Sequence, residues 1–183
     1  MNELNRNEKP LVVEYDPKWI EEFDAIAVVL AEAFGSLANN IYHVGSTAIP
    51  GMIAKPVLDI DVELAPGVDI PTATSILIPI GYEYEGDLGI PDRYAYRNTS
   101  PAVPFSNYRT SWMHHHLYVC PHESAELAKM LLFRDKLRNS AVLRKEYMQL
   151  KQKVLRIAKG VRQIYVDEKT RLGDDFFKRV LNS

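Results

Sequence analysis

The chain of 183 residues contains a single cysteine, Cys120. One cysteine cannot form an intramolecular disulfide, and it excludes a zinc site built from several cysteines. Because Cys120 ends an apolar run that is typical of a strand, we expect it to be a small buried residue.

Long apolar runs are also lacking. No stretch reaches the roughly 20 consecutive apolar residues that a membrane-spanning helix needs. The first ten residues, MNELNRNEKP, are polar and lack the apolar region of a signal peptide. We therefore expect a cytoplasmic protein without a membrane partner.

The charge is nearly balanced overall but unevenly distributed. Residues 1–121 contain 7 Lys and Arg against 16 Asp and Glu, a net charge of −9, whereas residues 122–183 contain 15 against 8, a net charge of +7. An acidic half that faces a basic half suits a metal–phosphate ligand between them, but ordinary helix surfaces rich in Lys and Arg explain the same numbers. The positive excess is small and interleaved with acids, so we expect no duplex nucleic acid as a partner.

Hydrophobic periodicity predicts strands first and helices afterwards, which indicates an α+β fold. A helix that begins at Asp16-Pro17 and ends at Gly35 precedes most strands, and another lies within 72–82, ending at Gly81. We predict a mixed sheet with an N-terminal helix and a C-terminal helical cap in one domain, 1–183, with the sheet in 11–121 and the cap in 122–183. The predicted strands cover 11–15, 41–44, 59–64, 82–86, 93–99 and 112–120, and the predicted cap helices cover 123–138, 141–159 and 161–181, the last with a possible break at Gly173.

One stretch, HVGSTAIPGMIAKPVLDIDVE at 43–63, combines a glycine turn with crowded carboxylates. On a strand, Asp59, Asp61 and Glu63 share one face, while the apolar residues between them share the other. Like charges at neighbouring positions of one face repel each other, and a divalent cation with oxygen ligands relieves that repulsion. This face therefore suits a divalent cation, and we expect Glu63 at its rim rather than as a ligand.

The chain resembles the GrpB family, a set of small proteins in the nucleotidyltransferase superfamily; a similar domain is fused to some dephospho-CoA kinases. The resemblance spans nearly the whole chain in family order. It rests on DPKW at 16–19, HVGSTAIPGMIAKPVLDI at 43–60, HHLYV at 115–119, LLFRDKLR at 131–138, EYMQLK at 146–151, and Tyr165 with Lys169.

The resemblance implies a nucleotidyltransferase-type α/β palm. In that superfamily a Gly-Ser turn cradles phosphates, and carboxylates on the next strand bind Mg²⁺. Carried over to this chain, Gly45, Ser46 and Thr47 form the phosphate turn, and Asp59 and Asp61 bind Mg²⁺ or Mn²⁺. The chemistry agrees, because glycine lets backbone N–H groups approach an anion closely and Ser46 adds a hydroxyl donor.

The strand at 112–120 departs from the active members of that superfamily, which usually supply a third carboxylate there. The resemblance implies an H-x-H pattern instead, whose second position is Tyr118 in this chain. His116 therefore stands in the position of the third ligand, either as a metal ligand or as a histidine that lines the site.

Several other polar residues have two interpretations each. Lys55 either meets a phosphate or pairs with Asp59, and Arg93 either reaches a substrate anion or is exposed. His43 either braces the Gly-Ser turn or touches a ligand, Arg134 and Asp135 suggest a helix-to-sheet pair, and we expect Lys169 on a solvated face.

The leading hypothesis is a metal-dependent nucleotidyltransferase that moves a nucleotidyl group from a nucleoside triphosphate to an unknown small acceptor. Asp59, Asp61 and His116 would carry the chemistry. The alternative is a binding or scaffolding domain with a nucleotide pocket but no turnover, and metal-dependent phosphoanhydride hydrolysis is a third reading. The sequence indicates neither the acceptor nor the oligomeric state.

Overall fold

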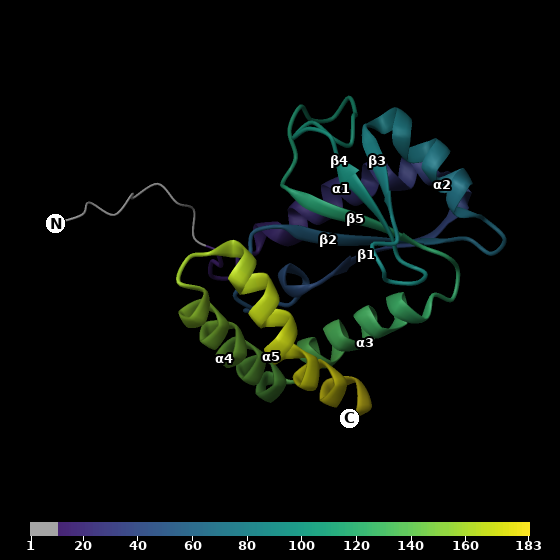
Figure 1. Cartoon of the computed structure of the whole chain (residues 1–183). Coiled ribbons are helices and arrows are strands. Elements are labelled where there is room, and N and C mark those ends of the chain that lie inside the picture. Colours follow the sequence, from purple (N-terminus) through teal and green to yellow (C-terminus); the bar gives the residue numbers. More distant parts are fainter. Residues whose placement is uncertain (1–10) are drawn as a thin grey trace.

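Five strands form one mixed sheet in the computed structural model, which describes residues 11–183. The strand order is β1-β2-β5-β4-β3; β2 and β5 run parallel, and the other neighbours are antiparallel (Figure 1). The strands are β1 Ala38–Val44, β2 Leu58–Leu64, β3 Tyr82–Gly86, β4 Tyr94–Asn98 and β5 His115–Cys120. This mixed sheet confirms the predicted fold class.

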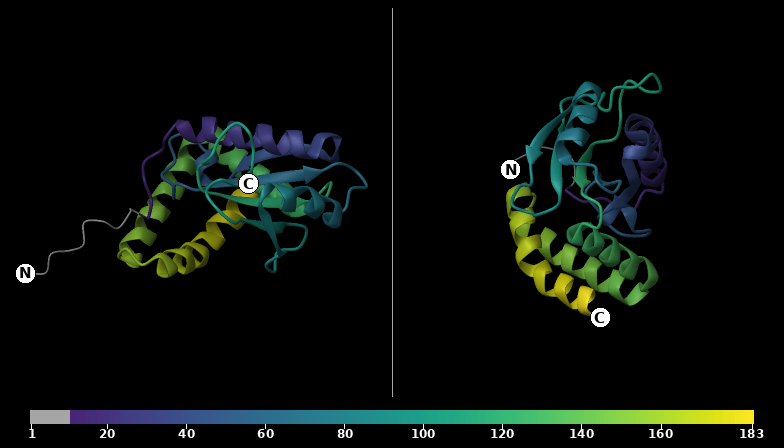
Figure 2. Two further views of the ribbon diagram at one scale, coloured as in Figure 1. Left: turned by 90° about the horizontal axis from the view of Figure 1, so that it is seen from above. Right: turned by 90° about the vertical axis from the view of Figure 1, so that its right-hand side faces the viewer.

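Helices cover the sheet on one face and form a layer beyond it on the other side. The first and second helices pack on the apolar face, and the last three run together in a separate layer (Figure 2). The helices are α1 Lys18–Phe34, α2 Ile70–Leu77, α3 Ala125–Asn139, α4 Ala141–Ala158 and α5 Arg162–Asn182. The N-terminal helix and the C-terminal helical cap are thus present as predicted.

The inner strand β2, which lies between β1 and β5, has one apolar and one acidic face, as its alternation predicts. Four apolar side chains, those of Leu58, Ile60, Val62 and Leu64, are fully buried in the main core. Ile26 and Leu30 of α1 are fully buried in the same core. Burial of a side chain of this size contributes about 1.5–3 kcal/mol, so this packing fixes the register and holds the carboxylates on the opposite face.

Several predicted boundaries differ from the structure; β1, for example, begins at Ala38 instead of residue 41, and α2 covers Ile70–Leu77 instead of ending at Gly81. Residues 11–15 form a single bridge instead of a strand, because only Val13 exchanges backbone hydrogen bonds with the loop before β2, at Ala54. β5 begins at His115 instead of residue 112, because Trp112 is held in the preceding loop by a hydrogen bond from its Nε1 to the Pro104 carbonyl. The possible break at Gly173 is wrong: α5 is continuous there, and packing of Phe176 and Val180 outweighs the weak helix preference of glycine.

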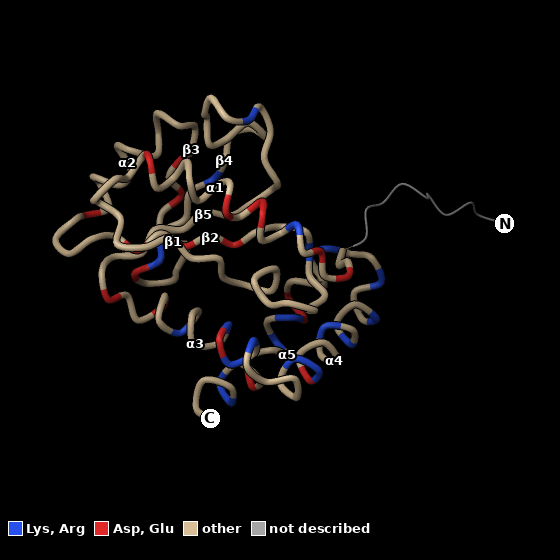
Figure 3. The backbone as a smooth tube through the Cα atoms, turned by 180° about the vertical axis from the view of Figure 1, so that it is seen from behind, with Lys and Arg blue, Asp and Glu red and all other residues tan. Residues whose placement is uncertain are grey.

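The uneven charge of the sequence is also uneven in space. The Asp and Glu segments gather mainly in the sheet-containing part, whereas Lys and Arg are in excess over Asp and Glu in the C-terminal helices (Figure 3). Across residues 11–183, no helix has the length and apolar character needed to cross a membrane.

Candidate functional site

The Gly-Ser turn is pressed directly against the first aspartate of β2. Gly45 ends β1 with φ of 71°, and a Cβ atom at this position would lie 2.2 Å from Asp59 Oδ2. A short 3₁₀ turn, Ser46–Ala48, follows at once. Only glycine combines this backbone conformation with so close an approach. The structure therefore brings together two of the elements that the sequence predicts, the turn and the carboxylate.

His43 and Thr47 brace the turn from beneath. His43 Nε2 lies 2.9 Å from Thr47 Oγ1, and the His43 ring stacks on Phe23 at 4.8 Å between centroids. Thr47 is 1% exposed, so its hydroxyl is committed to His43 below the turn. These contacts agree with the interpretation in which His43 braces the Gly-Ser turn.

Three basic side chains of the C-terminal helices, those of Arg134, Arg138 and Lys151, donate hydrogen bonds to the turn or to the strand end before it. Arg134 donates from Nη1 to the His43 carbonyl of β1 at 3.0 Å, which links the helix to the sheet. Its Nε pairs with Asp135 within α3, so Asp135 itself does not reach the sheet in this pair. Arg138 donates from Nε to the Ala48 carbonyl at 2.8 Å. The turn is therefore held by α3 as well as by the sheet.

Lys151 is the most buried of these cations, and the sequence reading did not single it out. It lies on α4, is 2% exposed, and donates from Nζ to Ser46 Oγ at 2.6 Å and to the Ile53 carbonyl at 2.7 Å. Burial lowers its pKa well below the ordinary lysine value. A signal was present: Lys151 falls in line with the buried Tyr147, Val154 and Ala158 at helical spacing.

Asp59 and His116 lie side by side on the parallel strands β2 and β5. They are register partners, and His116 Nδ1 lies 3.1 Å from Asp59 Oδ1. Burial acts to raise the pKa of Asp59, but the hydrogen bond and charge of His116, followed by Lys169 and Arg93, hold it below the ordinary value. Two of the three residues expected to share a metal ion, Asp59 and His116, are therefore in contact.

The carboxylate of Asp61 forms a buried ion pair with Arg93. Arg93 donates from Nη2 to Asp61 Oδ1 at 3.0 Å and from Nε to Oδ2 at 3.4 Å, and its guanidinium carbon lies 3.4 Å from the centroid of the Tyr118 ring. Asp61 is 0% exposed and Arg93 is 9% exposed, so the exposed alternative for Arg93 is wrong. Burial raises the pKa of Asp61, and the Arg93 charge opposes that rise.

Glu63, the third carboxylate of this face, is not at an exposed rim. It is 9% exposed, and its Oε2 accepts hydrogen bonds from Asn39 Nδ2 at 2.9 Å and from the Tyr42 hydroxyl at 3.2 Å. His122 Nδ1 lies 3.2 Å from its Oε1. These partners satisfy the carboxylate at the far end of β2 from the Gly-Ser turn.

Two lysine side chains, those of Lys55 and Lys169, lie within electrostatic reach of Asp59. Lys55 lies within electrostatic reach of Asp59, Arg162 and Lys169; burial and then the charge of Arg162 lower its pKa. Lys169 is half-buried and lies within electrostatic reach of Asp59, Tyr118, Tyr147 and Tyr165, so the prediction of a solvated Lys169 is wrong. The α5 helix places it there, a tertiary arrangement that helical spacing alone does not reveal. The surroundings of Asp59 therefore suit an anion.

The donor set fits a divalent cation only in part. Among residues 11–183, no three His, Cys, Asp or Glu side chains are grouped closely enough to hold a metal ion. The 3.1 Å between His116 Nδ1 and Asp59 Oδ1 is close to the roughly 3 Å that separates adjacent ligands of an octahedral ion with bonds of about 2.1 Å. Asp59 and His116 therefore fit one ion, whereas both Asp61 oxygens accept from Arg93.

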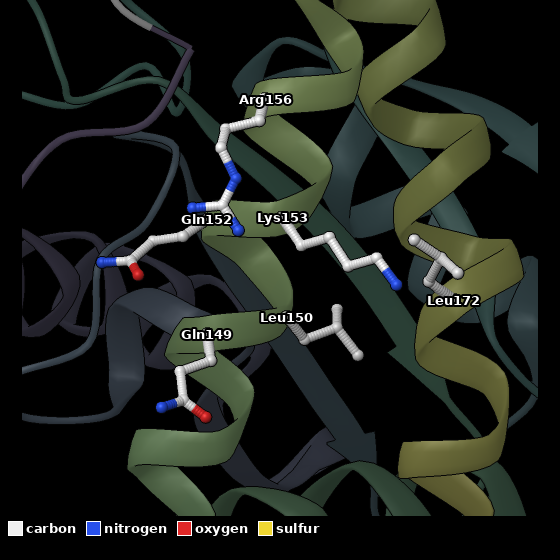
Figure 4. Close-up of a pocket in the computed structure, with 6 residues that line it drawn as sticks. All are labelled: Gln149, Leu150, Gln152, Lys153, Arg156 and Leu172. Atoms are coloured by element: carbon white, nitrogen blue, oxygen red, sulfur yellow. The ribbon is translucent and has the colours of Figure 1, made fainter.

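An open groove between α4 and α5 is separate from this site. Figure 4 shows its lining side chains, which include none of the predicted site residues. Gln149, Lys153 and Arg156 leave α4 on the side opposite Lys151. The complete lining is Gln149, Leu150, Gln152, Lys153, Arg156 and Leu172.

Two buried histidines make the fold sensitive to acid. Burial lowers the pKa of His43 and of His115 to about 4, whereas the unfolded chain titrates near 6.5. Between pH 6.5 and 4 the unfolded chain binds protons that the folded chain does not, so stability falls as the pH falls. We expect each histidine to remove on the order of 2 kcal/mol at pH 5 relative to pH 7, opposed by Asp61, whose raised pKa favours the folded state in acid.

Urea unfolding at the two pH values and NMR titration of the histidine ring protons measure this loss. Ring-proton midpoints near 6.5 for both buried histidines would contradict the expectation.

Comparisons with known proteins agree on the family. A family model described as GrpB protein matches residues 9–182. A UPF0157 protein of Halalkalibacterium halodurans is 31% identical over 92% of this chain and 80% of its own length. One of Pseudomonas aeruginosa is 34% identical over 93% of this chain, which spans 65% of that protein.

Solved structures agree on the fold. The crystal structure of the conserved protein GrpB from Enterococcus faecalis has a TM-score of 0.75 and 26% identity, and covers 93% of this chain and 97% of its own. The Cid1 poly(U) polymerase with MgGTP bound has a TM-score of 0.54 and 15% identity over 79% of this chain and 46% of its own. The second likeness shows a nucleotidyltransferase-like fold. Because the family model matches nearly the whole length of this chain, the chain belongs to the GrpB protein family.

Proposed function

We propose that the site at Gly45 and Asp59 binds a nucleoside triphosphate with a divalent cation and transfers its nucleotidyl group to a small acceptor. The observation that carries this proposal is the contact between the Gly-Ser turn and the Asp59 carboxylate, where a methyl group would lie 2.2 Å from Oδ2. That contact supports the proposal, because a glycine turn able to cradle phosphate and a carboxylate able to bind a metal lie next to each other, as nucleotidyl transfer requires.

The surroundings of the turn suit a triphosphate. Backbone N–H groups at a glycine turn bind anions, and the Ser46 hydroxyl, already 2.6 Å from Lys151 Nζ, adds a donor. Lys55 and Lys169 lie near Asp59 and offset the charge of the β- and γ-phosphates. Lys55 thereby keeps the phosphate role that its position before β2 predicts.

Asp59 and His116 are the residues that would hold Mg²⁺ or Mn²⁺. A bound ion would neutralise phosphate charge and orient the reacting oxygens. Asp59 keeps its charge at neutral pH, because His116 and the nearby cations hold its pKa low against the effect of burial. The fold-level likeness to a polymerase with bound MgGTP supports the assignment of a nucleotide, as an analogy.

A second candidate function is nucleotide binding without turnover. Two observations favour it: β5 offers His116 and Tyr118 instead of a third carboxylate, and Arg93 already neutralises Asp61. A domain of this kind would retain the phosphate turn and the cations but lack the paired carboxylates that catalysis uses.

One experiment distinguishes nucleotidyl transfer from nucleotide binding without turnover. The protein is incubated with each labelled nucleoside triphosphate, Mn²⁺ or Mg²⁺ and a pool of small metabolites, and pyrophosphate, inorganic phosphate and thermal stabilisation are measured. Transfer predicts pyrophosphate, loss of that product in Asp59→Asn, and no loss in Asp175→Asn, the same charge change at an exposed position of α5. Stabilisation without either product supports the binding domain, inorganic phosphate supports hydrolysis, and no stabilisation by any nucleotide contradicts the proposal.

A further inference from the structure

A positively charged side chain of the protein, that of Arg93, lies against the acidic face of β2. The Arg93 guanidinium binds both oxygens of Asp61 at 3.0 and 3.4 Å and lies over the Tyr118 ring at 3.4 Å. Tyr118 is the register partner of Asp61, so one aromatic ring supports the cation that pairs with its neighbour. Arg93, Asp61 and Tyr118 form a closed unit, which we name the Arg93 unit.

We infer that Arg93 takes the place of a second metal ion beside Asp61, so that the site holds one divalent cation, at Asp59 and His116. The inference deepens the proposed function, on which it rests for the presence of a cation, and it differs from the sequence-based expectation that Asp61 is a metal ligand.

Geometry and charge both keep a second ion away from Asp61. Its carboxylate is 0% exposed, and both oxygens are engaged by Arg93, which is itself 9% exposed. A divalent ion at Asp61 would have to displace a guanidinium that stacks on Tyr118, and it would sit beside a buried positive charge. The Arg93 unit thus does electrostatically what a second ion would do, because it neutralises the carboxylate.

The remaining pair has the spacing for one ion. His116 and Asp59 keep their coordinating atoms 3.1 Å apart, and their side chains are 42% and 33% exposed, so an ion reaches them from solvent. An imidazole and a carboxylate make a mixed donor set that suits Mn²⁺ better than Mg²⁺, which prefers oxygen ligands and water. Mn²⁺ is therefore the suitable probe.

The test counts ions without measuring activity. Calorimetry and electron paramagnetic resonance of free Mn²⁺ give the number of bound ions for the wild type, Asp59→Asn, Arg93→Gln and the double variant Asp61→Asn/Arg93→Gln. The double variant removes both charges of the Arg93 unit together, so no buried charge is left unpaired, and it serves the test even where Arg93→Gln fails to fold.

The expected result is one Mn²⁺ per wild-type chain, weakened by more than about tenfold in Asp59→Asn and changed by less than that in the double variant. Arg93→Gln, which frees Asp61, is expected to bind a second Mn²⁺. Two ions on the wild type, no ion on the wild type, or loss of the ion in the double variant would each overturn the inference.

Nucleotide binding is followed separately, by thermal shift with nucleoside triphosphates in the same samples. A wild type that binds two ions and is stabilised by nucleotide would contradict the inference but leave the proposed function in place. One bound ion without any response to nucleotide would contradict the proposed function but leave the inference about the number of ions in place.

Discussion

Gly45→Ala is expected to lower the affinity for a nucleoside triphosphate by more than about 100-fold, since displacements of about 1 Å at such sites cost that much. The new methyl group would lie 2.2 Å from Asp59 Oδ2 and 3.0 Å from its Cγ, so the turn and the carboxylate must move apart. The backbone at φ of 71° adds strain of about 1–3 kcal/mol for a residue with a Cβ atom. Titration of the variant with a nonhydrolysable triphosphate and Mn²⁺ measures the loss.

Gly51→Ala is the matched control for this substitution. Gly51 also has a positive φ, of 77°, but a Cβ atom there would meet nothing within 4 Å. Both variants carry backbone strain, and only Gly45→Ala disturbs Asp59. Equal losses of affinity in the two variants would show that strain alone, and not the contact with Asp59, accounts for the effect.

Lys151→Met is expected to weaken nucleotide binding by about 10- to 100-fold, which corresponds to one charge-assisted hydrogen bond of about 1.5–3 kcal/mol. Methionine fills similar space on α4 but removes the donor that holds Ser46 Oγ and the Ile53 carbonyl. We expect the free energy of unfolding to fall by only about 1–3 kcal/mol, because the buried ammonium was itself costly to desolvate.

Calorimetric titration and urea unfolding measure the two effects, and Lys153→Met controls for the lost charge. Lys153 lies on α4 but is exposed and lines the outer groove. If Lys151→Met unfolds more easily but binds nucleotide as the wild type does, Lys151 has a structural role only.

The parts of the fold that the sequence predicts are those set by local periodicity. The alternation of β2 predicts which side chains are buried, since successive residues of a strand face opposite ways. The resemblance placed Gly45 in a phosphate turn that needs a glycine for close approach, and the structure gives it a positive φ of 71°. The sheet order and the α4–α5 arrangement depend instead on contacts between distant segments.

The parts of the site that were missed depend on tertiary pairing. Arg93 reaches Asp61 from 32 positions along the chain, and Lys151 reaches Ser46 from 105. Spacing within one segment carries no information on such pairs, so Arg93 was expected either at a substrate anion or on the surface, and Lys169 in solvent. The buried stripe of α4 was the one local hint, because it contains a lysine where apolar residues are typical.

The most direct test of the nucleotide site is a crystal structure with a nonhydrolysable nucleoside triphosphate and Mn²⁺. We predict the triphosphate over the Gly45–Ser46 turn, its β- and γ-phosphates near Lys55 and Lys169, and an anomalous Mn²⁺ peak within bonding distance of Asp59 and His116. A nucleotide bound in the groove between α4 and α5, with the turn empty at saturating ligand, would contradict this account.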